Sequence, residues 1–370
     1  MPATPRSDVQ VREAEVTVLR IFDVADGIDL VGVERALTGR GTVARIRLSR
    51  VEPKAIAFGD PPVVTDLMAP ALEIGGTRVA TRASARIHSF GVVSLSVDLV
   101  LPAPMPWAAF ERFAREAERE AAGLSFWRVS LDALLEQIRP AMDRPSAVRM
   151  EEDYAVVTVR ALDGCRATDL PRAVDLVPLL THETRALGEA ARRDVLKHAY
   201  SYYEDDLAVL TWDRALVVEP SPDDDLTDIL EVANAQLLEL RYYDALLDAE
   251  LPRIYTQAAH ARHNAWVLRG RYSRAANQMR ALVAEVVQIT EKVDNAIKVT
   301  DDVYLARVYG AALELFRVRF WTDAIDRKLA LIRDTYTALY DEAVATRAEW
   351  LEVAILLLIV LETVVAVVRH

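Results

Sequence analysis

Cysteine is almost absent: the 370-residue chain has one, Cys165. A single cysteine excludes an intramolecular disulfide and a zinc site built on several thiolates. A reactive thiol needs a partner that lowers its pKa, and the turn-like stretch after Gly164 suggests none. Cys165 is therefore interpreted as structural, and the scarcity of cysteine fits a reducing compartment.

Sequence motifs that are characteristic of catalytic sites are also absent. The chain has no phosphate-binding loop, no GxGxxG and no HExxH, so no catalytic residue, cofactor or metal ligand is assigned. His260 and His263 are three residues apart on an expected helix, but no carboxylate lies between Glu250 and Glu285 to complete a metal site. The sequence favours a non-enzymatic protein without excluding an enzyme.

Lysine is scarce, with five lysines against 39 arginines, and the formal net charge is −12. This acidity argues against wrapping nucleic acid with the whole surface. The preference for arginine and alanine indicates a GC-rich bacterial genome.

Residues 1–16 lack an apolar core, so no secretory signal is expected there. Apolar residues make up 52% of the chain, which is enough for packed cores.

The first 220 residues mix strand-like and helix-like patterns. Alternating β-branched residues predict strands, and an amphipathic stretch between prolines and Gly123 predicts a helix. The expected elements are strands over 9–22, 154–162 and 206–220, a strand pair over 81–102 broken near Gly91, and a helix over 104–123. We expect an α+β domain over 1–220, for which a ferredoxin-like topology is one candidate.

Residues 221–349 have helical periodicity. Ser221, Pro222 and the three aspartates that follow are typical of a helix start, and a metal-binding acidic cluster is the weaker alternative. Apolar residues follow heptad spacing over 282–303 and again over 325–350. Two such seams joined near 299–302 predict a long antiparallel, coiled-coil-like helical hairpin.

The segment 350–368 is the longest apolar run, and 13 of its residues are Leu, Ile or Val. About 20 apolar residues span a bilayer, so we expect a C-terminal transmembrane helix that acts as a tail anchor. This predicts a single-pass protein of the cell inner membrane with its bulk facing the cytoplasm. The alternative is a core helix of a soluble oligomer.

Glu362 lies inside this run, and Glu352 and Trp350 lie at its edge. An ionisable residue inside a membrane usually faces another helix. These three residues are therefore predicted to contact a second copy in a homo-oligomer, or another membrane protein.

Residues 251–284 contain arginines and aromatic residues but no acid. Such a stretch can contact anionic lipid, can bind RNA or a ribosome, or can pair with acids on neighbouring helices. The candidate lipid or nucleic-acid contacts are Arg262, Arg269, Arg271 and Arg274.

Three segments resemble one known family. "DRKLALIRDTYTALYDEAVATRAEWLEVAILLLIVLE" (326–362) is similar to the end of the uncharacterised family that includes the eukaryotic "required for meiotic nuclear division" proteins. "ELRYYDALLDAELPRIY" (239–255) and "HSFGVVSLSV" (88–97) resemble two further segments of that family. The resemblance implies a membrane-associated protein without established catalytic activity.

These observations together predict a tail-anchored, non-enzymatic membrane scaffold or tether that presents a cytosolic domain. Its domains would be 1–220, 221–349 and 350–368. Two alternatives stay open: an enzyme with an unrecognised site in 1–220, and an adaptor associated with RNA or the ribosome.

Overall fold

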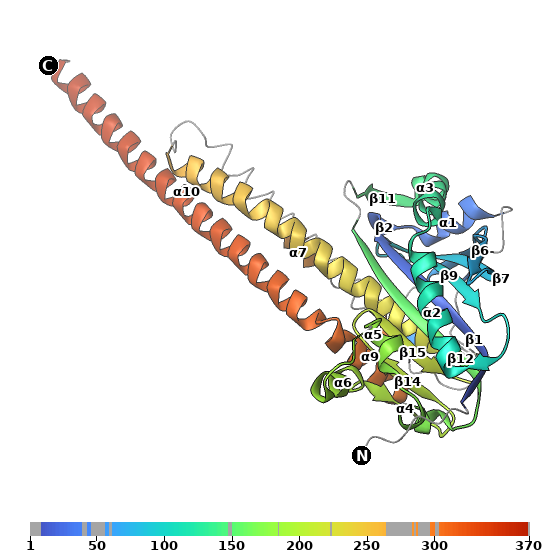
Figure 1. Ribbon diagram of the computed structural model, residues 1–370. Coiled ribbons are helices and arrows are strands. Elements are labelled where there is room, and N and C mark those ends of the chain that lie inside the picture. Colours follow the sequence, from blue (N-terminus) through green and yellow to red (C-terminus); the bar gives the residue numbers. More distant parts are fainter. Residues whose placement is uncertain are drawn as a thin grey trace. The chain divides into compact units, whose positions relative to one another are not determined.

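The computed structural model describes residues 9–38, 43–45, 56–58, 61–146, 150–183, 185–222, 224–263, 283–284, 286–287, 297–299 and 303–368. Figure 1 shows the described helices and strands. The chain divides into two compact units. The first unit comprises Met1–Glu239 and Lys292–Arg319, and the second comprises Leu240–Glu291 and Phe320–His370.

A ten-stranded sheet is the centre of the first unit. Nine strands follow the order β13-β14-β15-β12-β1-β9-β8-β5-β3, and β10 pairs with β1. Their bounds are β1 (Gln10–Asp23), β3 (Val43–Arg45), β5 (Val63–Asp66), β8 (Thr81–Ile87), β9 (Val92–Val100), β10 (Met105–Pro106), β12 (Glu151–Asp163), β13 (Ala199–Tyr200), β14 (Leu207–Leu210) and β15 (Arg214–Val218). Three two-stranded sheets pair β11 (Met142–Pro145) with β2 (Ala25–Ile28), β16 (Ile297–Val299) with β4 (Ile56–Phe58), and β6 (Leu72–Ile74) with β7 (Thr77–Val79).

The central strand β12 shows that both faces of the sheet are covered. Its residues 154–159 are all buried, although successive side chains point to opposite faces. A strand covered on both faces is apolar without alternation, and the run "YAVVTV" has that composition.

Helices α1 (Leu30–Leu37), α2 (Trp107–Ala122) and α3 (Phe126–Ile138) join the apolar core on one face of the sheet. In α2 the buried side chains recur every three or four residues, from Phe110 through Phe113 and Ala117 to Ala121, which is the stripe of an amphipathic helix. The helix starts after Pro106 and ends at Gly123, as the sequence predicts.

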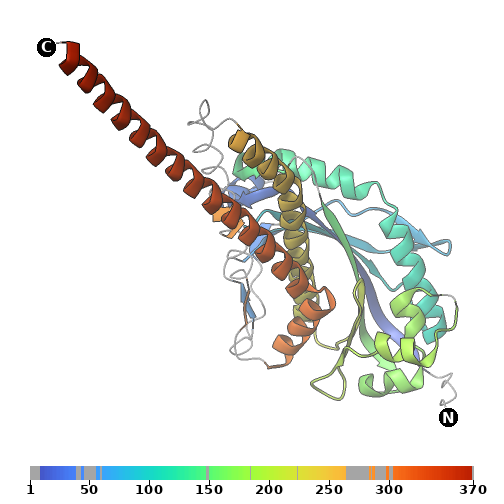
Figure 2. The same ribbon diagram turned by 90° about the vertical axis from the view of Figure 1, so that its left-hand side faces the viewer.

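The first turns of helix α7 (Asp225–His263) cover the other face (Figure 2). Arg86 of β8 reaches this helix, with its Nη1 atom 2.5 Å from Asp228 Oδ1 and 2.9 Å from Glu231 Oε2. His88 Nε2 lies 3.7 Å from the other oxygen of Glu231. Burial raises the pKa of Asp228 to about 6, although the charge of Arg86 opposes this shift. A buried ion-pair cluster thus holds α7 against the sheet.

Gly91 allows the turn between β8 and β9 to pass against β2. Its φ angle is +100°, and a Cβ atom at this position would lie 1.7 Å from the carbonyl oxygen of Ala25. The amides of Val24 and Ala25 donate to the Gly91 carbonyl at 3.0 and 3.3 Å. Only glycine is compatible with both the positive φ angle and the lack of room for a Cβ atom.

Four further α-helices belong to the described first unit: α4 (Leu170–Ala173), α5 (Val177–Thr181), α6 (Glu189–Val195) and α9 (Val303–Leu315). In the second unit, α7 continues and contacts helix α10 (Val318–Val368). The ammonium group of Lys328 on α10 lies 2.6 Å from a carboxylate oxygen of both Asp244 and Asp248 on α7.

The expected fold class is wrong. The described part of the chain is mixed α/β with one large sheet, and it contains neither a ferredoxin-like domain nor a long helical hairpin. Most of the first predicted arm, 282–303, lies outside the described residues. The predicted hairpin turn at 299–302 fails because residues 297–299 form β16, which pairs with β4. The second predicted arm is also interrupted, since α9 ends at Leu315 and α10 begins at Val318.

The expected membrane anchor is wrong as well. No helix found among the residues with described placement has the length and apolarity needed to cross a membrane. Residues 350–368 are the end of the 51-residue helix α10, where Glu352 and Glu362 are exposed, and carboxylates oppose transfer into hydrocarbon. The predictions of an inner-membrane location and of a tail-anchored scaffold are corrected accordingly.

Candidate functional site

Strands β12 and β15 are the one parallel pair among the strand pairings that the structure describes. Their register runs from Ala155 opposite Arg214 to Val159 opposite Val218. The carboxyl ends of parallel strands meet at one edge of a sheet, and loops that leave this edge commonly form ligand sites. Both ends of this pair carry polar groups.

A pocket of about 470 Å³ lies at the carboxyl ends of β12 and β15. One wall comes from the turn at Gly164–Ala167 after β12, and another from the loop between β13 and β14. Its lining residues are Arg160, Leu162, Cys165, Arg166, Ala167, Tyr203, Glu204, Asp205, Val218 and Pro220.

An ion pair joins the two walls. Arg166 Nη1 lies 2.6 Å from Glu204 Oε2, and both side chains are exposed, at 65% and 79%. The hydroxyl of Thr168 donates to the carbonyl oxygen of Glu204 at 3.4 Å. Exposed pairs of this kind contribute about 0–1 kcal/mol, so the pocket mouth can open at little cost.

The floor of the pocket combines a paired guanidinium with aliphatic side chains. Arg160 donates to the carbonyl oxygens of Ser221 at 2.5 Å and Glu219 at 3.3 Å, and it pairs with Asp224 and Glu15. Its charge is thus already compensated by the protein. The buried side chains of Val218 and Ala167, with the partly buried Leu162, supply apolar surface.

Negative charge accumulates beside the pocket. Burial raises the pKa of Glu219, and the carboxylates of Asp206 and Asp205 add to this shift, while the amide of Ser221 and the charge of Arg160 oppose it. Glu219 therefore lies in a region where further negative charge is disfavoured.

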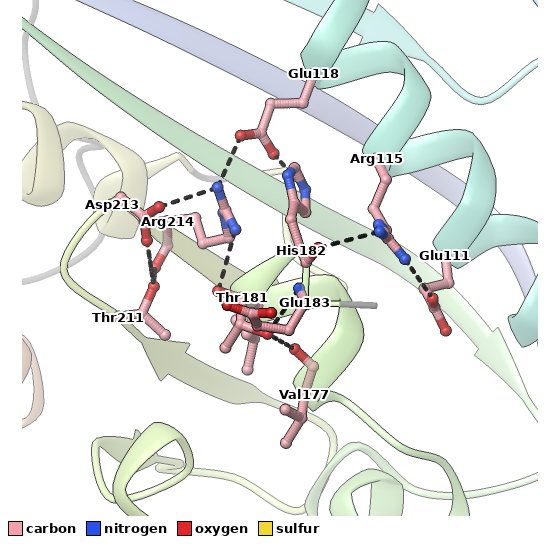
Figure 3. A network of polar contacts seen from close by, with 11 residues as sticks. Glu111, Arg115, Glu118, Val177, Thr181, His182, Glu183, Thr211, Asp213 and Arg214 are labelled. Atoms are coloured by element: carbon pink, nitrogen blue, oxygen red, sulfur yellow. Dashed lines mark hydrogen bonds and ion pairs between the residues drawn. The ribbon is translucent and has the colours of Figure 1, made fainter. Parts of the chain in front are cut away.

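The amino ends of the same strands carry a polar network (Figure 3). Arg214, at the start of β15, is 9% exposed, and its Nη2 atom lies 3.1 Å from Glu118 Oε1 and 3.0 Å from Asp213 Oδ2. The other carboxylate oxygen of Glu118 lies 3.1 Å from His182 Nε2, and the two atoms do not form a hydrogen bond. The contact is electrostatic and depends on protonation of the imidazole.

The backbone around His182 is fixed by the same helix. Arg115 Nη2 donates to the His182 carbonyl at 3.2 Å, and His182 ends α5 with a left-handed φ of +53°. Glu118 and Arg115 both belong to α2, so the network joins α2, α5 and the start of β15. Its groups bond chiefly to one another, which indicates that it positions these elements.

Two of the residues predicted from sequence to make helix contacts, Glu352 and Glu362, are exposed on α10, and Trp350 belongs to the same helix. Arg262 lies in α7, whereas Arg269, Arg271 and Arg274 lie outside the described residues. None of the four described residues is among those that line the pocket. Their contacts with a second copy, lipid or nucleic acid stay predictions.

Sequence reasoning missed the pocket because its residues come from three separated stretches. Cys165 and the preceding glycine were noted as a turn, but no binding role followed from them. A turn after one strand becomes informative only when a second strand is known to run parallel beside it.

Comparison with known proteins corrects the expected family and source. A family model described as "Uncharacterized protein MJ0711, N-terminal domain" matches residues 13–225. The resemblance to the "required for meiotic nuclear division" family is therefore wrong. The prediction of a bacterial protein is corrected too, because the relatives that match come from archaea.

Three curated proteins show the extent of similarity. Uncharacterized protein MJ0711 of Methanocaldococcus jannaschii is 24% identical over 195 residues, which are 52% of this chain and 59% of that protein. Two Halobacterium salinarum proteins named dihydroorotate dehydrogenase (quinone) are 31% identical over 131 residues, which are 34% of this chain and 37% of each relative. No solved structure gave a significant match.

The matched residues 13–225 make up more than half of the chain and include the whole pocket lining and the polar network. Because the family model covers this share, the chain belongs to the family of the MJ0711 N-terminal domain.

Proposed function

We propose that the first unit binds a small molecule in the pocket at the carboxyl ends of β12 and β15. The observation that carries this proposal is the pocket itself, whose volume of about 470 Å³ lies within the range of small-molecule sites, about 300–1,000 Å³. Its place at the ends of a parallel strand pair and its mixture of aliphatic, aromatic and charged groups support the proposal.

The test is a thermal-shift screen of the full chain against small metabolites of every charge class. Because two relatives carry the name dihydroorotate dehydrogenase, the panel includes dihydroorotate. A compound that binds only the native state raises the melting temperature by mass action. We expect at least one compound to do so in proportion to its concentration.

Two variants of one residue show whether the pocket is responsible. Cys165→Phe fills pocket space, whereas Cys165→Ser keeps the volume nearly unchanged. We expect the shift to survive in the serine variant and to disappear in the phenylalanine variant. A shift of equal size in both variants, or no shift with any compound, would overturn the proposal.

A further inference from the structure

We infer that the pocket takes a small zwitterion of the amino-acid type, with an ammonium group, a carboxylate and an aliphatic side chain. The inference rests on the proposed binding function and adds the chemical class of the ligand. It follows from which charges of the pocket are free to meet a ligand, from their signs, and from the apolar floor between them.

Only one of the two guanidinium groups is available to a ligand. Arg160 is held by two carbonyl oxygens and by the carboxylates of Asp224 and Glu15. Arg166 is instead 65% exposed and has one carboxylate partner, Glu204, across the mouth. A ligand carboxylate can therefore replace Glu204 on Arg166, with the bidentate geometry that guanidinium favours.

Opening that ion pair leaves Glu204 free for a second contact. Glu204 is 79% exposed, and Asp205 follows it in the same pocket wall. Two carboxylates beside the released guanidinium match an ammonium group close to a carboxylate, which is the arrangement in an α-amino acid. A zwitterion can thus compensate both members of the broken pair, whereas a single charge compensates one.

The sign of the surrounding charge decides against phosphate-bearing ligands. Arg166 stands against Glu204 and Asp205, and Glu219 and Asp206 add negative charge close by. A multiply charged anion would meet repulsion from these groups. In a zwitterion the attraction of the ammonium group offsets the repulsion of the carboxylate, so the pocket discriminates against nucleotides and sugar phosphates.

The uncharged lining selects the side chain of the ligand. Leu162 and Val218 form an aliphatic floor, and Tyr203 and Pro220 add apolar surface at the rim. Burial of an aliphatic group against such surface is favourable. Leucine satisfies the two charged contacts and the floor together, so it is the probe of choice.

The experiment is calorimetric titration of the full chain with L-leucine, 4-methylpentanoate and 3-methylbutylamine. The second probe lacks the ammonium group and the third lacks the carboxylate. We expect leucine to bind at least about tenfold more tightly than either analogue, because the loss of one charge-assisted contact raises the dissociation constant by about tenfold or more.

Charge-removing variants locate the two contacts. Arg166→Gln and Glu204→Gln should each weaken leucine binding by about tenfold. Arg172→Gln serves as the matched control, because Arg172 is 85% exposed, pairs with Asp169 at 3.7 Å and does not line the pocket. Its affinity for leucine should equal that of the wild type.

The outcomes separate this inference from the proposed function. Equal binding of leucine and one analogue, or no leucine binding while another compound of the screen binds at the pocket, overturns the zwitterion and leaves the proposed function standing. No binding by any probe or panel compound overturns both. Leucine binding that Arg166→Gln and Arg172→Gln leave equally unchanged also overturns the inference.

Discussion

One carboxylate oxygen of Glu118 lies 3.1 Å from His182 Nε2, and the other lies 3.1 Å from Arg214 Nη2. A single side chain of α2 therefore contacts both the imidazole of the residue that ends α5 and the guanidinium at the start of β15. The relationship places Glu118 at the centre of the network in Figure 3 and makes its removal informative.

Glu118→Ala should lower the free energy of unfolding by about 1–3 kcal/mol, because Arg214 is buried and loses one of its two carboxylate partners. Urea denaturation followed by circular dichroism measures this change. Glu116→Ala is the matched control, since Glu116 lies on the same helix but is 40% exposed and 3.9 Å from Arg119. Equal losses in the two variants would show that Glu118 has no special part in holding α2.

Two substitutions of His182 separate the cost of its backbone conformation from the effect of its contact with Glu118. His182→Gly and His182→Val both remove the imidazole, so their difference reports the left-handed φ of +53°. Valine disfavours this conformation and glycine does not, and the penalty for a side chain is about 1–2 kcal/mol. The glycine variant should be more stable than the valine variant by about this amount in the same denaturation experiment. The opposite order would contradict the structure at this turn.

The buried carboxyl group of Asp23 should make the free energy of unfolding depend on pH. The residue is 1% exposed, and burial raises the pKa of its carboxyl group from 3.8 to about 7, a shift that the hydroxyl of Ser146 opposes and the charge of Asp26 supports. Between these two pKa values the folded state binds more protons than the unfolded state, so Asp23 makes stability fall as the pH rises. The penalty is complete above about pH 7 and absent below the unfolded pKa.

Asp23→Asn removes this titration. Its stability relative to the wild type should be higher at pH 8 than at pH 5 by a few kcal/mol, since each pKa unit corresponds to about 1.4 kcal/mol. Unfolding measured at both pH values provides the comparison. The exposed Asp143 supplies the control Asp143→Asn, which should show no such difference. A relative stability of Asp23→Asn that is the same at both pH values would show that the carboxyl group titrates normally.

Local patterns predicted much of the first unit. The alternation over 9–22 corresponds to β1, the strand pair broken near Gly91 corresponds to β8 and β9, and the helix ending at Gly123 is α2. These elements are determined by side-chain periodicity and by glycine or proline at their ends, which a short window of sequence contains.

Pairings between distant residues were not predictable in this way. Residues 297–299 lie within a helical periodicity, yet they pair with β4, about 240 residues earlier in the chain. Ser221 was expected near the start of a helix, but α7 begins at Asp225, and the carbonyl of Ser221 accepts from Arg160 of β12 instead. Tertiary contacts decide both outcomes, and no local window contains them.

The candidate site was not predictable for the same reason. Arg166, Glu204 and Val218 have no common motif or spacing, and they come together because β12 and β15 run parallel. Periodicity can predict a strand, but it does not determine which strand is its neighbour. The chemistry of the pocket becomes visible only after the order of the sheet is known.

Occupation of the pocket by a small molecule can be measured through the reaction rate of the Cys165 thiol. This residue is the one cysteine of the chain, it is partly buried, and it lines the pocket. Its rate of reaction with N-ethylmaleimide is measured on the native chain with increasing concentrations of a compound that raises the melting temperature. We expect the rate to fall about elevenfold at ten times the Kd, following simple occupancy, and to be unaffected by the compound in denaturant. A stabilising compound that leaves the native rate of Cys165 unchanged would contradict the account, because its binding site would then lie elsewhere.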